Sequence, residues 1–144
     1  FSLDFLPDLA VDGVIAGPAG TGRVGAVARE DVARSAAAVL ADLAAGESRH
    51  DGAVYELTGP RALSLSDVAA ILTAAGHPTV YRQESVEEAY ASRSVYGAPD
   101  WQVDAWVSTY TAIASGALDR VTHDVERLTG RRPLGLAELL AGRP

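Results

Sequence analysis

Three glycines in residues 17–22 are of the type that lets a backbone approach a phosphate group, as in nucleotide-binding loops. A dinucleotide fingerprint needs such glycines between a strand and a helix, so that the pyrophosphate lies on the helix N-terminus. Here residues 24–28, with the small and β-branched side chains of a strand, follow Gly22. The pattern predicts a turn between strands, with the wall of a pocket as the alternative, and not a cofactor fingerprint.

Residues that could catalyse a reaction are scarce. The three histidines lie far apart, in predicted loops or at a helix start, and have no ligand partners at metal-binding spacing: His50, His77 and His123. Asp31 suits the start of a helix better than the role of a general base. All twelve basic residues are arginines, which excludes a P-loop lysine, a Schiff-base lysine and a Tyr-x-x-x-Lys pair. We therefore assign no catalytic residue and no metal site.

Aromatic residues are more informative about binding. Trp106 and Tyr110 fall on one helical stripe with Val103 and are predicted to be core. Trp101 points away from this stripe. It could line a pocket or contact a partner, or it could be covered by the loop of residues 95–98. The other candidates for an apolar pocket are Phe1, Phe5, Tyr90 and Tyr96.

The elements that position these residues are organised around residues 24–44. A short apolar strand is predicted at residues 24–28, and a helix follows it. The apolar residues of this helix form one stripe: Val32, Ala36, Val39, Leu40 and Leu43. We expect this helix to be buried against a second layer, the basic step of an α/β protein.

Short strands and helices also alternate in the rest of the predicted chain. Residues 1–6 have the pattern of a helix end, and short strands are predicted at 14–16, 53–57 and 80–82. Capping-box patterns begin helices at Ser64 and Ser85, and a long helix follows Pro99. The prediction is one α/β unit over residues 1–144 that is richer in helix than in strand.

Composition narrows the class of protein. The chain of 144 residues is 48% hydrophobic and 22% charged, as in ordinary globular domains. No apolar run reaches the roughly 20 residues that span a bilayer. The net charge of −7 argues against a nucleic-acid partner, and the absence of cysteine is compatible with the cytoplasm, where we expect the protein. Phe1 begins inside an apparent helix, so we take the chain to be part of a longer protein.

Seven short motifs, in order along nearly the whole chain, resemble the C-terminal half of NmrA-like atypical short-chain dehydrogenase/reductases. This family consists of NAD(P)-binding proteins and includes quinone-oxidoreductase-like members. The motifs are residues 1–6 (FSLDFL), 17–23 (GPAGTGR), 29–33 (REDVA), 55–59 (YELTG), 65–69 (LSDVA), 86–90 (VEEAY) and 129–133 (TGRRP).

The resemblance implies the C-terminal part of a Rossmann-like doubly wound α/β fold with a small helix-rich substrate lobe. The glycine fingerprint for NAD or NADP would lie in an N-terminal half that this sequence lacks, or in a partner chain. Phe1 would follow the strand beside the nicotinamide and so contact the cofactor. The resemblance also places seven residues in the substrate pocket: Phe1, Phe5, Gly17, Pro18, Tyr90, Tyr96 and Trp101.

Two functions remain open from the resemblance. One is an NAD(P)-dependent oxidoreductase acting on a quinone or another small carbonyl compound, and the other is a non-enzymatic NAD(P)-sensing regulator. A nucleotide-sugar epimerase shares the Asp-Val-Ala step at residues 31–33 but usually has a larger C-terminal lobe. In each case the strand at 53–57 would lack its neighbours in this chain, which leaves an unpaired edge.

Overall fold

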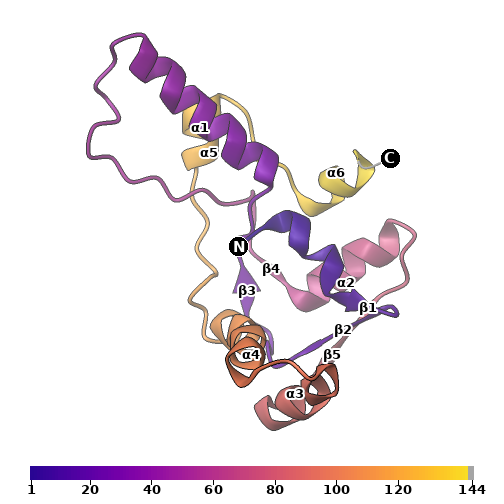
Figure 1. Ribbon diagram of the computed structural model, residues 1–144. Coiled ribbons are helices and arrows are strands. Elements are labelled where there is room, and N and C mark those ends of the chain that lie inside the picture. Colours follow the sequence, from indigo (N-terminus) through magenta and orange to yellow (C-terminus); the bar gives the residue numbers. More distant parts are fainter. Residues whose placement is uncertain (143–144) are drawn as a thin grey trace.

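The computed structural model describes residues 1–142 as a mixed α/β chain (Figure 1). Its helices are α1 (Arg29–Ala44), α2 (Leu65–Ala74), α3 (Val86–Arg93), α4 (Asp100–Ala114), α5 (Asp124–Thr129) and α6 (Leu136–Ala141). Three short 3-10 helices are η1 (Leu3–Phe5), η2 (Pro7–Leu9) and η3 (Ser94–Tyr96). The strands are β1 (Ala10–Val11), β2 (Val14–Gly17), β3 (Arg23–Val24), β4 (Leu63–Ser64) and β5 (Val80–Gln83). The helix end predicted for residues 1–6 is wrong in type, because this segment forms a 3-10 turn that runs into a second one at Pro7.

The central sheet has the order β1-β2-β5. β2 pairs with β1 in the antiparallel sense and with β5 in the parallel sense, with Ile15 opposite Tyr81. A second, two-stranded sheet joins β3 to β4. The strands predicted at 14–16 and 80–82 are confirmed.

The glycine-containing loop connects β2 to β3. The Tyr81 hydroxyl donates to the Gly17 carbonyl (2.8 Å) and accepts from the Ala19 N–H (3.1 Å). Gln83 Oε1 accepts from the Gly20 N–H at 2.8 Å, where φ is +57° and glycine is favoured. Side chains of β5 thus clamp the loop, and the prediction of a turn between strands is confirmed.

Helix α1 forms where it is predicted, but its predicted inward stripe is wrong. The residues that α1 buries are Asp31 and Ser35, whereas Leu40 is 65% exposed and Leu43 is 45% exposed. Figure 1 shows α1 at the top of the molecule, with α5 alongside it. The apolar stripe of α1 therefore faces solvent in this chain, because no sheet layer formed by residues 1–142 covers it.

Residues 53–57 form no strand, so this predicted strand is also wrong for the chain as described. Val54 is 87% exposed. The Glu56 N–H donates to Asp124 Oδ2 at 2.8 Å, and the Glu56 carbonyl accepts from the Thr122 hydroxyl. Contacts with residues 122–124 thus replace part of the ladder that a neighbouring strand would provide.

Both predicted capping boxes are present. The Ser64 hydroxyl accepts from the Asp67 N–H at the start of α2, and the Ser85 hydroxyl accepts from the Glu88 N–H at the start of α3. These caps fix where the two helices begin, and β5 lies between them in the chain. The end of β5 and the start of α3 are therefore held in a defined geometry.

The main core joins the N-terminal turns, β2, α2 and the end of α4, with Leu6, Ile15, Leu65 and Ile113 fully buried. A smaller cluster of Ala89, Val103 and Val107 packs α3 on α4. None of the helices within residues 1–142 has the length and apolarity to cross a membrane.

Candidate functional site

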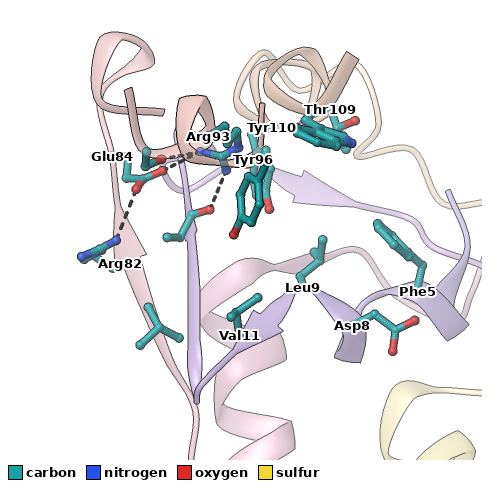
Figure 2. Close-up of a pocket in the computed structure, with 14 residues that line it drawn as sticks. Phe5, Asp8, Leu9, Val11, Arg82, Glu84, Arg93, Tyr96, Thr109 and Tyr110 are labelled. Carbon is teal, nitrogen blue, oxygen red and sulfur yellow. Dashed lines mark hydrogen bonds and ion pairs between the residues drawn. The ribbon is translucent and has the colours of Figure 1, made fainter. Parts of the chain in front are cut away.

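An open pocket of about 670 Å³ lies between the β1-β2-β5 sheet, the N-terminal turns and the α3–α4 pair (Figure 2). The turns η1 and η2 supply Phe5, Asp8 and Leu9 from one side, and α3, η3 and α4 supply aromatic and polar side chains from the other. Its lining residues are Phe5, Asp8, Leu9, Val11, Val14, Ala16, Arg82, Glu84, Ser92, Arg93, Tyr96, Trp106, Thr109 and Tyr110.

Aromatic rings shape the upper wall of the pocket. Tyr96 and Trp106 meet edge to face with centroids 6.0 Å apart, and Tyr110 follows Trp106 by one helical turn of α4. Phe5 of η1 lies on the other side of the pocket from Tyr96 and Tyr110 (Figure 2). Rings on two sides suit a flat, conjugated ligand, since such a ligand gains both burial and ring contacts.

A buried ion pair closes one end of the pocket. Arg93 Nη1 donates to Glu84 Oε2 at 3.0 Å, and its Nη2 donates to the Ala16 carbonyl at 3.0 Å. The side chains of Arg93 and Glu84 are 11% and 6% exposed. This pair joins the last turn of α3 to the ends of β2 and β5, and so fixes α3 beside the sheet.

The charges of the pocket lining cancel. Arg82 approaches Glu84 Oε1 at 3.3 Å from the solvent side, and Asp8 is the second acid. Two arginines and two acids line the pocket, so its wall has no formal net charge. An anionic ligand gains no free counter-ion here, because both arginines are already paired with Glu84, and the formally neutral wall suits a ligand without net charge.

Tyr110 lies where the pocket meets the core. Its ring is 8% exposed, packs against the backbone of Gly17, and has the Arg93 guanidinium 5.1 Å from its centroid. Behind it, burial raises the pKa of the Tyr81 phenol, which therefore stays a hydrogen-bond donor to the loop.

Two of the seven residues predicted from the resemblance, Phe5 and Tyr96, line this pocket. The centroid of the Phe1 ring lies 6.1 Å from that of the pocket residue Phe5. Gly17 and Pro18 are buried, and the backbone of Gly17 packs against the Tyr110 ring.

Tyr90 and Trp101 lie outside the pocket lining. The Tyr90 hydroxyl donates to Asp104 Oδ1 at 2.9 Å, and this hydrogen bond is the main reason why the pKa of Tyr90 is raised. Trp101 is 70% exposed near the start of α4. Contact of Phe1, Gly17, Pro18, Tyr90 and Trp101 with substrate, and of Phe1 with a cofactor, stays a prediction.

Sequence reasoning missed the polar residues of the pocket. Glu84 and Arg93 come from a strand end and a helix end, and no local spacing links a carboxylate to a guanidinium across such a boundary. Tyr110 is on the core stripe, as predicted, but the same stripe also reaches the pocket. The run Arg82-Gln-Glu84 at the end of a predicted strand is the available signal, since strand ends are frequent sites of binding residues. No cluster of three potential metal ligands occurs in the described part of the chain.

Three curated proteins are similar to this chain over most of its length. Quinone oxidoreductase 2 of Escherichia coli is 32% identical over 127 residues, which are 88% of this chain and 43% of that protein. An NAD(P)H azoreductase of Xenophilus azovorans is 35% identical over 122 residues, 84% of this chain and 41% of that protein. The chain thus spans less than half the length of these relatives. No family model matches it.

Solved structures agree with this similarity. The NADPH complex of the Escherichia coli quinone oxidoreductase superposes with a TM-score of 0.79 at 29% identity, covering 96% of this chain and 48% of that one. Triphenylmethane reductase of Citrobacter sp. complexed with NADP(H) gives a TM-score of 0.76 at 25% identity, covering 97% of this chain and 47% of that one. The chain therefore has the α/β fold of one part, about half, of Rossmann-like NAD(P)-binding reductases.

Proposed function

We propose that this chain is the substrate-binding, C-terminal portion of an NAD(P)H-dependent oxidoreductase of the NmrA-like atypical short-chain dehydrogenase/reductase type, acting on a quinone or another small carbonyl compound. The observation that carries the proposal is the ring-lined pocket without net charge. It occurs in a chain similar to a quinone oxidoreductase and an azoreductase, whose named substrates are flat conjugated molecules.

The chemistry of the pocket supports this substrate class. Phe5, Tyr96 and Trp106 offer ring faces and edges to a conjugated acceptor, and the Tyr110 hydroxyl offers a hydrogen-bond donor. The walls shield one side of such a ligand from water, which favours transfer of a hydride over loss of reactive intermediates to solvent.

The described residues do not fit the phosphates of a dinucleotide. The glycines of residues 17–22 are clamped between two strands by Tyr81 and Gln83. At the N-terminus of α1, the Arg29 N–H already donates to Asp4 Oδ2 at 2.8 Å. In our proposal the residues that bind the phosphates of the cofactor belong to the other part of a longer protein. No catalytic step is assigned to residues of this chain.

The uncovered surfaces support that longer protein. One parallel β-α layer would cover the apolar stripe of α1 and could also pair with the backbone of residues 53–57. The partner in the proposal is therefore a Rossmann-type half, supplied by the same polypeptide or by a second chain.

The proposal is tested on the natural protein that contains this chain, by following NADH and NADPH oxidation with 1,4-naphthoquinone, an azo dye and an aldehyde as acceptors. We expect oxidation that depends on the acceptor and is fastest with a conjugated acceptor. Tight cofactor binding without turnover on any acceptor would favour the NAD(P)-sensing regulator instead.

A further inference from the structure

The five tyrosines of the chain differ in what their hydroxyls bind. Three hydroxyls are hydrogen-bonded inside the protein, those of Tyr55, Tyr81 and Tyr90. Tyr96 is 65% exposed, so water can satisfy its hydroxyl. Tyr110 is 8% exposed, and within residues 1–142 no group is hydrogen-bonded to its hydroxyl. Its oxygen is nevertheless not sealed in the core: among residues 1–142 the one buried side-chain atom without a hydrogen-bond partner is Ser2 Oγ, so the Tyr110 hydroxyl is open to the pocket.

The Tyr110 hydroxyl points into the pocket. Figure 2 shows the phenol oxygens of Tyr96 and Tyr110 directed toward the pocket interior. Water can bind this hydroxyl while the pocket is empty. A ligand that fills the pocket displaces that water, and because a covered polar group is almost always hydrogen-bonded, the ligand is the natural source of an acceptor for this O–H.

The ring of Tyr110 has little freedom to turn the hydroxyl elsewhere. A Cβ on Gly17 would overlap the ring, so the backbone of β2 is in direct contact with it. The Arg93 guanidinium lies 5.1 Å from the ring centroid and is itself fixed by Glu84 and the Ala16 carbonyl. A donor held in place in this way loses little conformational freedom when an acceptor arrives.

The same contacts define what the acceptor can be. Arg93 is already paired with Glu84, so it does not attract an anionic ligand into the pocket. The rings of Phe5, Tyr96 and Trp106 favour a flat conjugated body.

We propose that the Tyr110 hydroxyl donates a hydrogen bond to an oxygen or nitrogen acceptor of a flat, uncharged, conjugated ligand in the pocket, with Arg93 as the positioning residue that holds the phenol ring. This inference deepens the proposed function and rests on it for the identity of the site. The inference assigns the selection of ligands that carry a hydrogen-bond acceptor, over hydrocarbons of the same shape, to the hydroxyl of Tyr110.

The test is equilibrium dialysis of the natural protein with 1,4-naphthoquinone and with naphthalene, which has the same fused rings but no acceptor. Tyr110→Phe keeps the ring and removes the hydroxyl. We expect it to weaken naphthoquinone binding by about 5- to 10-fold, the contribution of one neutral hydrogen bond, and to leave naphthalene binding within about twofold. Tyr55→Phe, which removes a hydroxyl that is hydrogen-bonded to His50 outside the pocket, is the matched control and should change neither.

Three results would overturn the inference: an unchanged naphthoquinone affinity in Tyr110→Phe, equal losses for both probes, or no binding of naphthoquinone to the wild-type protein. If Tyr110→Phe fails to fold, the double variant Arg93→Met with Glu84→Gln replaces it. That variant frees the ring and should lower the preference for naphthoquinone over naphthalene, and an unchanged preference would contradict the role of Arg93.

The outcome is separable from the proposed function. A selective loss in Tyr110→Phe, in a protein that never oxidises NAD(P)H, would support the donor and reject the oxidoreductase. Oxidation of NAD(P)H by the wild-type protein, together with the same naphthoquinone affinity in Tyr110→Phe as in wild type, would support the oxidoreductase and reject Tyr110 as the donor.

Discussion

The backbone of Gly17 lies directly against the ring of Tyr110, so that a single added carbon at residue 17 would overlap the Tyr110 Cδ1 and Cγ atoms. This contact joins β2 of the sheet to the buried side of α4. It explains why a residue that begins the glycine-containing loop is needed for packing as well as for the turn.

We expect Gly17→Ala to destabilise the protein by about 1–3 kcal/mol, because overpacking must displace the clamped ring. Urea unfolding measures the loss. In a Tyr110→Ala background the same substitution should cost much less, since the obstacle is gone. A cost independent of residue 110 would show that the contact is not the cause.

Asp31 connects the start of α1 to a distant segment. Its carboxylate is 1% exposed, accepts from the Leu134 N–H at 2.7 Å and pairs with Arg34 at 3.0 Å. We expect Asp31→Ala to cost about 1–3 kcal/mol, because it leaves the half-buried Leu134 N–H without its partner. Glu30→Ala, which removes an exposed partner of the same arginine, should cost less than about 1 kcal/mol. Similar costs in chemical denaturation would contradict the anchoring role of Asp31.

Glu84 has two arginine partners of unequal burial. Glu84→Ala would leave Arg93 nearly buried without its counter-ion, and we expect a loss of about 3 kcal/mol. Arg82→Ala removes an arginine whose side chain is 65% exposed, and we expect a loss below about 1 kcal/mol. Thermal unfolding of both variants compares the two ion pairs directly, and equal shifts in Tm would argue against a buried Glu84–Arg93 pair.

Asp67 gives α2 a dependence on pH. The hydrogen bond from the Ser64 backbone N–H is the main reason why the pKa of Asp67 is below its ordinary value of 3.8. The folded protein therefore binds this proton less readily than the unfolded chain. The stabilisation is complete above the ordinary pKa and disappears as the pH falls through the lowered one.

Asp67→Asn should thus destabilise the protein by a constant amount, about 1 kcal/mol as for a helix cap, at neutral pH. The difference from wild type should shrink below about pH 4. Unfolding free energies measured across this range test the prediction. Leu72→Ala, on the same helix and without an ionisable group, should show no such trend.

The exposed stripe of α1 makes a prediction about the longer protein. In the structure of this chain Leu40 is 65% exposed, and a polar replacement there should have almost no effect. If a Rossmann-type half covers α1 in the natural protein, Leu40→Gln should cost about 2 kcal/mol through lost apolar burial. Glu47→Gln, beyond the end of α1 in an exposed loop, is the control. A negligible loss for Leu40→Gln would reject the covering layer.

Local signals predicted most of the elements correctly. The capping boxes at Ser64 and Ser85 and the helical spacing from Val103 to Ile113 depend on neighbours within a few residues, and all three features are present. The stripe of α1 and the strand at 53–57 depend on a second layer of structure. Since that layer is not formed by residues 1–142, the sequence pattern and the observed burial disagree there.

The site was predictable in part for a similar reason. Phe5 and Tyr96 were identified as pocket residues through the resemblance, and both line the pocket. The Glu84–Arg93 pair joins the end of a strand to the end of a helix, and such a contact follows from the tertiary arrangement alone. Tyr110 was recognised as a core residue, but no spacing rule shows that the free end of a core side chain opens into a cavity.

The cancelled charges of the pocket have a kinetic consequence. The charges of Arg82, Arg93, Asp8 and Glu84 sum to zero, while the chain as a whole has a net charge of −7. Capture of a neutral dye or quinone is then governed by diffusion alone and is insensitive to ionic strength. A sulfonated analogue is slowed by long-range repulsion, which added salt relieves because it shortens the Debye length.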